Sequence, residues 1–369
     1  MPVHLYASAQ NDNRVRHFEV DPDTGRLAHL ADTEVPDGPG PLAVAPDATT
    51  LFVGHRGRAS VETTGGAGIP RPEFGLSSWA VDPESGDLTQ TGRVHTEGEP
   101  CFLSTDRRGR FLLSAYYQAG ACAVHPLDAS GALGGDAIEW RPTNSGAHSF
   151  QVDRANRFAF VPHIAEGSGG LARLPEGRRT GINAILQFRF DQQTGQLTPN
   201  DPPRVTPEDP IGPRHYAFHP TRDLVYVNNE QGSVVTTYAL DPDRGTLSPV
   251  QTVPTIPEGH DRPNAPAQIH IDPNGRYLFC SNRGHDSIAA YLIDAATGQL
   301  TPAGWTAVGE RPRAFGVDPT GRFLYVTSQV AGTLAAYRID ERTTALTHLD
   351  TYEVGQVPMW VSFATLPGR

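Results

Sequence analysis

The stretch "APAQIHIDPNGRYLFCSNRGHDSIAAYLIDAATGQL", residues 265–300, contains the two phrases that decide the fold. The first is a short apolar strand, a turn built on Asp-Pro-x-Gly-Arg, and a second strand of aromatic and aliphatic residues. The second phrase is an apolar strand that ends on an acidic residue, a turn with Gly near its end, and then Leu. Each phrase predicts a β-hairpin, because polar turn residues and Gly separate two runs of strand-forming residues.

Both phrases recur along the chain. The second phrase occurs in seven copies, which begin at Phe18, Trp79, Val124, Phe188, Tyr238, Tyr291 and Tyr337. The first phrase alternates with it in six copies, which begin at Gly40, Glu99, Ala147, Gly212, Ala265 and Arg311. A seventh copy is split, with one strand at Val357–Ala364 and the other at Val3–Gln10.

Two hairpins per unit and seven units predict an all-β fold, a seven-bladed β-propeller of four-stranded antiparallel blades. The split copy predicts that the N-terminal and C-terminal strands pair and close the ring, which removes a free sheet edge. We expect residues 1–369 to form one propeller domain. The alternative is a pair of β-sandwich domains, but that architecture gives no reason for one pair of phrases to recur seven times.

The bulk composition limits the function classes. The net charge of −11 disfavours binding to nucleic acid or to an anionic membrane, because the field of the protein repels phosphate. Three widely spaced cysteines indicate neither a disulfide framework nor a zinc site. Without an apolar segment of membrane-spanning length or a signal-like N-terminus, we expect a cytoplasmic protein.

The repeat also shows where the chain departs from its own template. The position that opens the inner strand, strand A, is occupied in the seven blades by Leu42, Cys101, His148, Arg214, Ala267, Arg313 and Met359. The position that ends the next strand, strand B, is occupied by Arg56, Tyr117, Ile164, Glu230, Arg283, Gln329 and Gln10. Both positions lie at the same mouth of the central channel, so we expect their polar members to converge there.

Arginines outnumber the acidic residues in these columns. A set of mutually satisfied salt bridges could plug the channel, but one glutamate cannot neutralise Arg214, Arg283, Arg313 and Arg56. The surplus instead predicts a site for an anion, because guanidinium groups match carboxylate or phosphate.

Several further residues are weaker candidates. His215 and His270 lie on or beside the channel wall, where they could bind substrate or simply make hydrogen bonds, and Asn282 and Gln329 end their strands at the mouth. His219 and the turn arginines Arg276 and Arg322 are predicted to be structural.

The pattern predicts neither a metal site nor a cofactor, because no His/Asp/Glu cluster at ligand spacing and no glycine-rich phosphate loop occurs. Two insertions, residues 57–76 and 165–184, would lie over the mouth. They would either act as a partial lid or have no functional role.

The phrases "GPRHYAFHP" (212–220), "VYVNNE" (225–230), "IHIDPNGRYLFCSNRGHDSIAAY" (269–291) and "RPRAFGVDPTGRFLYVTSQ" (311–329) resemble those of the seven-bladed propeller lactonase family. This family includes the propeller type of 6-phosphogluconolactonase and carboxymuconate cycloisomerases. The chain departs from it in the two insertions and in "TRD" at 221–223. The resemblance implies a metal-independent enzyme whose catalytic set falls on His148, Arg214, Glu230 and Arg283.

The leading hypothesis is hydrolysis of a lactone that bears a carboxylate or phosphate, as in 6-phosphogluconolactone. Arg214, with Arg283 or Arg313, would hold the anionic group and polarise the ring carbonyl, and Glu230 or His148 would take a proton from water. One alternative is a cycloisomerase that closes a muconate-type diacid into a lactone. The other is a non-catalytic propeller that binds ligands or proteins. The partner would be a small anionic lactone or diacid, and a closed ring is expected to act as a monomer.

Overall fold

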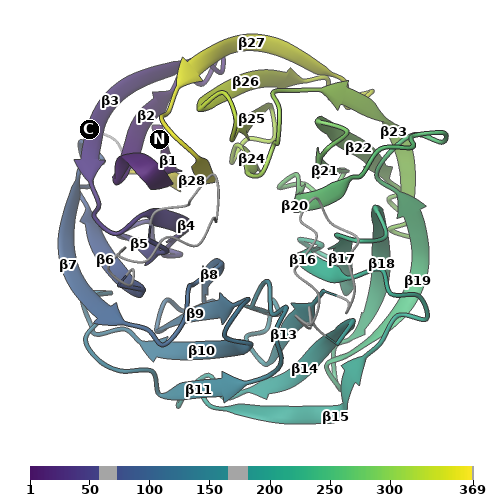
Figure 1. Cartoon of the computed structure of the whole chain (residues 1–369), viewed down its shortest axis with the longest axis horizontal. Coiled ribbons are helices and arrows are strands. Elements are labelled where there is room, and N and C mark those ends of the chain that lie inside the picture. The colour runs from purple at the N-terminus through teal and green to yellow at the C-terminus, as the bar shows by residue number, and fades with distance from the viewer. Residues whose placement is uncertain (58–72, 165–181, 368–369) are drawn as a thin grey trace, which may run out of the picture.

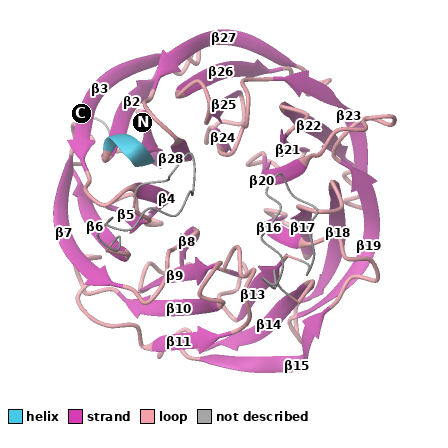
Figure 2. Ribbon diagram, viewed as in Figure 1, coloured by secondary structure: helices cyan, strands magenta, loops and turns pink. Residues whose placement is uncertain are grey.

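The chain folds into a ring of seven four-stranded antiparallel sheets around a central axis, as the computed structural model shows (Figure 1). The structure describes residues 1–57, 73–164 and 182–367. The predicted all-β propeller with seven blades is therefore confirmed. Figure 2 shows strands throughout the described part and one short 3₁₀ turn, η1 (Gln10–Asp12).

In blades 1 to 6 the strands run from the axis outward in chain order. Blade 1 consists of β4 (Pro39–Val44), β5 (Thr50–His55), β6 (Gly75–Val81) and β7 (Leu88–His95). Blade 2 consists of β8 (Phe102–Thr105), β9 (Phe111–Tyr116), β10 (Ala121–Pro126) and β11 (Glu139–Pro142). Blade 3 consists of β12 (Gln151–Val152), β13 (Phe158–His163), β14 (Ala184–Phe190) and β15 (Leu197–Val205).

The same order continues around the ring. Blade 4 consists of β16 (Pro213–Phe218), β17 (Leu224–Asn229), β18 (Val234–Asp241) and β19 (Thr246–Pro254). Blade 5 consists of β20 (Ala265–Ile271), β21 (Tyr277–Arg283), β22 (Ser287–Ile293) and β23 (Leu300–Ala307). Blade 6 consists of β24 (Phe315–Val317), β25 (Phe323–Ser328), β26 (Thr333–Ile339) and β27 (Leu346–Glu353).

Blade 7 closes the ring with strands from both ends of the chain. It consists of β28 (Pro358–Thr365), β1 (Val3–Ala9), β2 (Arg14–Val20) and β3 (Leu27–Glu34). Strand β1 pairs with β28 in an antiparallel register that includes Val3 opposite Thr365. The predicted closure by pairing of the terminal strands is confirmed, and β28 covers the edge that β1 would otherwise leave free.

The aspartates of the repeated phrases organise the turns. In the turn between strands A and B of blade 5, Asp272 Oδ1 accepts hydrogen bonds from the backbone N–H groups of Arg276 and Tyr277. In the turn between strands C and D of blade 7, Asp21 Oδ1 accepts from Asp23 and Thr24, and Gly25 follows with φ of +73°. Side-chain acceptors and a left-handed glycine are what such tight turns require.

The turn residues that were predicted to be structural have structural contacts. His219 takes the place of the aspartate in blade 4, where its Nδ1 accepts the backbone N–H groups of Thr221 and Arg222. Arg322 donates to the carbonyl of Pro22 in the next blade. Arg276 lies over the ring of Tyr277 at 4.8 Å. The two arginines therefore contact a neighbouring blade and an adjacent ring.

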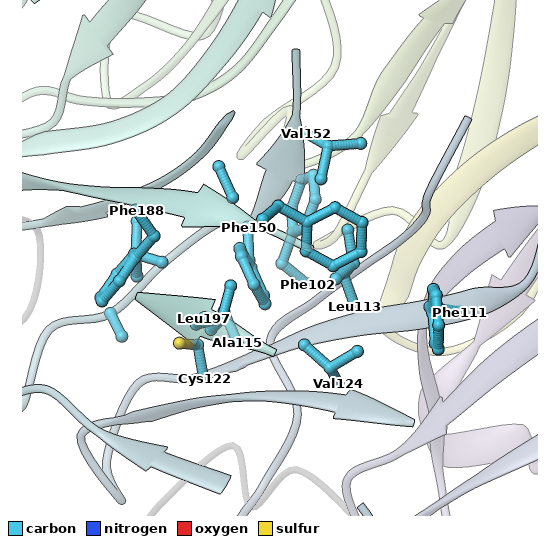
Figure 3. Packing of buried hydrophobic residues seen from close by; sticks show 14 of the residues in the cluster. Phe102, Phe111, Leu113, Ala115, Cys122, Val124, Phe150, Val152, Phe188 and Leu197 are labelled. Atoms are coloured by element: carbon cyan, nitrogen blue, oxygen red, sulfur yellow. The ribbon is translucent and has the colours of Figure 1, made fainter. Parts of the chain in front are cut away.

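The hydrophobic core lies between neighbouring blades. Figure 3 shows one such cluster, in which Phe111 and Leu113 of blade 2 pack with Phe150, Val152 and Phe188 of blade 3. Removing one such buried phenyl group costs about 3–5 kcal/mol in most proteins. The blades are therefore held as one ring, and their inner strands keep fixed positions around the axis.

Neither a membrane-spanning helix nor a metal-binding group is present in the described residues. Their one helical element, η1, is far too short to cross a bilayer. They also contain no group of three or more His, Cys, Asp or Glu side chains placed to hold a metal ion.

Candidate active site

The candidate site lies where strands A begin and strands B end. Arg214 is the second residue of β16, and Glu230 directly follows β17, its antiparallel partner. The register brings Pro213 opposite Asn229 and, in blade 5, Ala265 opposite Arg283. The two sequence columns therefore meet at one mouth of the channel. A pocket of about 170 Å³ forms there, lined by Arg56, Glu99, Cys101, Tyr117, Gln118, His148, Glu230, Arg283 and Arg313.

Glu230 holds two of the arginines in place. Its Oε2 accepts a hydrogen bond from Nε of Arg214 at 2.6 Å and lies 3.1 Å from Nη2 of Arg283. Burial raises the pKa of Glu230, but the charges of Arg283, Arg214 and Arg313 outweigh it and lower the pKa overall. Glu230 is therefore an ionised carboxylate whose basicity is weakened by two guanidinium partners.

Both arginines are also fixed by backbone carbonyl groups. Arg214, whose side chain is 2% exposed, donates through Nη1 to the carbonyl oxygen of Ala267. Arg283 donates through Nε to Ala265 at 3.1 Å. Because these carbonyls belong to β20, blades 4 and 5 share the support of the ion-pair network.

A second carboxylate, which the sequence reasoning missed, occupies the opposite side of the pocket. Glu99 Oε1 accepts a hydrogen bond from Nε of Arg56 at 2.5 Å. Glu99 lies two residues before Cys101 in the loop that enters strand A of blade 2. In the other blades that position is occupied by Gly40, Gly146, Gly212, Ala265, Arg311 and Val357. A comparison of the seven residues at this position would have shown that Glu99 is the one acidic residue among them.

Arg313 differs from the other guanidinium groups of the pocket. Within the part of the chain that the structure describes, it has neither a hydrogen bond nor an ion pair. Burial lowers its pKa, and the neighbouring charges of Arg214, Arg56 and Arg283 lower it further. A cation without a partner beside three other cations is a place where an anion would be stabilised.

His148 contributes an uncharged imidazole. It precedes β12, is 6% exposed, and packs edge-on against the rings of Tyr117 at 5.3 Å and His215 at 5.2 Å. Burial lowers the pKa of His148 well below its usual value, and the charges of Arg214 and Arg313 act in the same direction. The ring is therefore neutral near pH 7 and can accept a proton.

Cys101 lines the pocket but is not activated as a nucleophile. Burial raises the pKa of its thiol to about 11, and Sγ–H donates to the carbonyl of Ala115 at 3.3 Å. The thiol is therefore protonated near neutral pH. Only the deprotonated thiolate would attack a carbonyl group.

Four of the predicted substrate-binding residues do not line this pocket. His215 and His270 lie farther along the inner strands and line a different pocket. Gln329 faces a groove between blades 6 and 7 and donates to Sδ of Met359. Asn282 is fully buried and donates to the carbonyl of Thr255 at 2.6 Å, in the segment that follows β19 of blade 4. This geometry gives Gln329 and Asn282 no support as substrate-binding residues.

The site as a whole carries a surplus of positive charge. Four guanidinium groups, those of Arg56, Arg214, Arg283 and Arg313, face two carboxylates, those of Glu99 and Glu230. The pocket can therefore bind an anion and stabilise negative charge that develops on an oxygen atom. Most of each predicted insertion, residues 57–76 and 165–184, lies outside the described residues, whose strands β6 and β14 begin at Gly75 and Ala184.

Comparison with known proteins identifies the family of the chain. Residues 4–363 match the family model described as "Lactonase, 7-bladed beta-propeller". The chain is 34% identical to a 6-phosphogluconolactonase of Pectobacterium carotovorum, with 98% of each chain covered. It is 31% identical to a 6-phosphogluconolactonase of Serratia proteamaculans, with 97% of this chain and 98% of the relative covered.

A solved structure gives the same result. The periplasmic gluconolactonase of Pseudomonas aeruginosa superposes with a TM-score of 0.85 at 26% identity, and the match covers 100% of both chains. The predicted resemblance to propeller lactonases is confirmed, and with it an enzyme that hydrolyses lactones. The chain belongs to the seven-bladed β-propeller lactonase family.

Proposed function

We propose that this protein hydrolyses a phosphorylated sugar lactone of the 6-phosphogluconolactone type. The observation that carries the proposal is the unpaired guanidinium of Arg313 in a pocket with surplus positive charge. The names of the relatives support a phosphorylated lactone more than a diacid. The phosphate would pair with Arg313, and the lactone ring would lie toward Arg283 and His148.

In the proposed reaction, a water molecule attacks the carbonyl carbon of the ring while neutral His148 accepts a proton from it. The carbonyl oxygen becomes an oxyanion, which the Arg283 guanidinium stabilises. The bond between the carbonyl carbon and the ring oxygen then breaks. The proton held by His148 passes to the departing ring oxygen, which yields a hydroxy acid and regenerates the neutral imidazole.

Glu230 has a different role in this scheme. Its Oε2 atom is already engaged by both Arg214 and Arg283, whereas Nδ1 of His148 has no hydrogen-bond partner among the described residues. We infer that it orients the two arginines and that His148 is the general base.

The test is a comparison of His148→Gln and Glu230→Gln on 6-phosphogluconolactone, with the rate of spontaneous hydrolysis subtracted. His148→Gln should lower kcat by about 10² or more, the usual contribution of a general base. Glu230→Gln should affect both KM and kcat, because Arg214 and Arg283 lose their anchor. Wild-type turnover in both variants would overturn the assignment. Conversion of a carboxymuconate in preference to the lactone would instead favour the cycloisomerase, and inactivity on both would favour a binding platform.

We further propose that the protein acts as a monomer in the cytoplasm. The closed ring supports the first part, because β28 covers the edge of β1 that could otherwise pair with a second copy. Light scattering coupled to size exclusion, and fractionation of the native cells, test the two parts. A dimer in solution would contradict the first part. Recovery with the periplasmic fraction, the compartment named for the Pseudomonas relative, would contradict the second.

A further inference from the structure

A second pocket, of about 280 Å³, lies farther along the inner strands than the candidate active site. Among its lining residues are His215 of β16 and Gln268 of β20, each of which directly follows a strand A residue near the first pocket, Arg214 or Ala267. Arg107, another lining residue, belongs to the turn that joins β8 to β9. Because these turns lie at the opposite end of strand A from the first pocket, the second pocket opens on the other face of the ring.

Aromatic rings form one part of its wall. The rings of Phe102 and Trp360 meet edge to face with centroids 5.6 Å apart, and Phe218 also lines the pocket. In the described residues the indole N–H of Trp360 has no hydrogen-bond acceptor. A wall of this kind offers flat apolar faces together with a polar donor.

Two side chains of β20 offer a defined donor and a defined acceptor. Gln268 is 3% exposed, and its Oε1 already accepts the backbone N–H of Phe315 at 3.0 Å and Nε2 of His270 at 3.2 Å. The amide NH₂ of Gln268 has no partner among the described residues and is a free donor. Burial lowers the pKa of His270 to about 4, so its ring is neutral. Its Nε2 carries the proton that is donated to Gln268, and Nδ1 is therefore a hydrogen-bond acceptor.

His215 adds a buried polar group with no partner. The side chain is 4% exposed, and in the described part of the chain its Nε2 is buried without a hydrogen bond. A buried polar atom left unpaired destabilises the protein, and a ligand hydroxyl in the pocket would supply the missing hydrogen bond.

Arg107 supplies positive charge at the rim. Its Nε and Nη2 donate to the carbonyls of Asp153 at 3.1 Å and Val152 at 2.9 Å, which fixes the guanidinium plane. Its Nη1 has no hydrogen-bond partner among the residues that the structure describes. In the turns of blades 4, 5 and 6, the same position is occupied by Pro220, Pro273 and Pro319. The arginine is therefore not required by the turn.

We propose that this second pocket binds a sugar acid, a single hydroxylated ring that carries a carboxylate. The aromatic faces would pack on the C–H groups of the ring, and the mixed donors and acceptors would match its hydroxyl groups. Arg107 would pair with the carboxylate. The volume accommodates one ring and is at the small end of the range for ligand pockets. The proposal is independent of the reaction at the first pocket.

The test is calorimetric titration of the full-length protein with D-glucuronate. Saturable binding is expected, and Arg107→Gln should weaken it about tenfold or more, since a hydrogen bond to a charged group is lost. Arg154→Gln is the matched control, because Arg154 holds the same turn position in blade 3 but pairs with Asp223 and does not line the pocket. This control should bind as the wild type does.

A second variant fills the pocket without removing a contact. Ala217 of β16 lines it, so Ala217→Leu should abolish glucuronate binding while lactone hydrolysis continues at the wild-type rate. D-Glucose, which lacks the carboxylate, should bind about tenfold more weakly than D-glucuronate. Four results would overturn the proposal: no saturable binding in the wild type, full binding in Ala217→Leu, tighter binding of benzoate than of glucuronate, or binding that depends on Arg313 and not on Arg107.

Discussion

The imidazole rings of His148 and His215 meet edge to face with their centroids 5.2 Å apart, and no hydrogen bond joins them. His148 lines the candidate active site, and His215 lines the pocket at the other end of the channel. On its other side His148 contacts the ring of Tyr117 at 5.3 Å. The ring that we assign as the general base is therefore positioned by packing between two aromatic neighbours.

We expect His215 to act on the reaction only by this packing. His215→Ala should lower kcat about tenfold, because the His148 ring loses the surface that orients it, whereas KM should change little. His215→Phe restores a flat ring of similar size and should return kcat to near the wild-type value. Steady-state kinetics on the lactone distinguish the two variants. A His215→Phe variant as impaired as His215→Ala would show that the nitrogen atoms of His215, and not its shape, are needed.

Arg313 should determine the preference for a phosphorylated substrate. Arg313→Gln removes the unpaired guanidinium, so KM for 6-phosphogluconolactone should rise about 10- to 100-fold, equivalent to about 1.5–3 kcal/mol for a hydrogen bond to a charged group. KM for unphosphorylated gluconolactone should stay nearly constant. Arg311→Gln, an exposed arginine of the same loop, is the control and should leave both values unchanged. Equal losses on both lactones would place Arg313 at the reacting carbonyl instead.

The repeat made the fold and much of the site predictable from the sequence. Most turn phrases contain their own acceptor and glycine, as at Asp272 and Gly275, so the strand boundaries and the blade count follow from local chemistry. Arg214, Glu230 and Arg283 could be placed at one mouth because the antiparallel register within a blade relates the two sequence columns. That placement needs no knowledge of side-chain conformation.

The partners across the channel could not be predicted in this way. The pairing of Glu99 with Arg56 joins two blades, and the direction of a long side chain is not set by its place in a repeat. The separation of His215 from the mouth likewise depends on the pleat of β16, where consecutive residues point to different surroundings. Asn282 was expected at the mouth because it lies near the end of a strand, but its amide donates to the carbonyl of Thr255, which directly follows β19 of blade 4.

The pH dependence of turnover should reflect the low pKa of His148. Because the neutral ring is the active form, kcat should stay constant as the pH falls from 7 to below 6.5 and decline only at still lower pH. Arg313 is one of the charges that lower this pKa, so Arg313→Gln should move the acidic decline of kcat toward higher pH. The measurement is kcat from pH 4.5 to 7.5 with saturating lactone. An unchanged profile in the variant would mean that another group controls the acidic limb.

The stability of the fold should also fall at mildly acidic pH, through a histidine that has no part in the site. His125 of β10 is 2% exposed, both of its ring nitrogens are buried without partners among the described residues, and burial lowers its pKa to about 4. The unfolded chain therefore takes up a proton at this residue between about pH 6.5 and pH 4, where the folded chain does not. The free energy of unfolding should decrease as the pH falls through this range, by up to about 1.4 kcal/mol per pH unit for this one group.

Urea unfolding at pH 7.5 and pH 5 should show a smaller loss of unfolding free energy in His125→Leu than in the wild type. His348→Leu, at an exposed position, should keep the wild-type loss, and equal losses in all three proteins would show that His125 does not contribute.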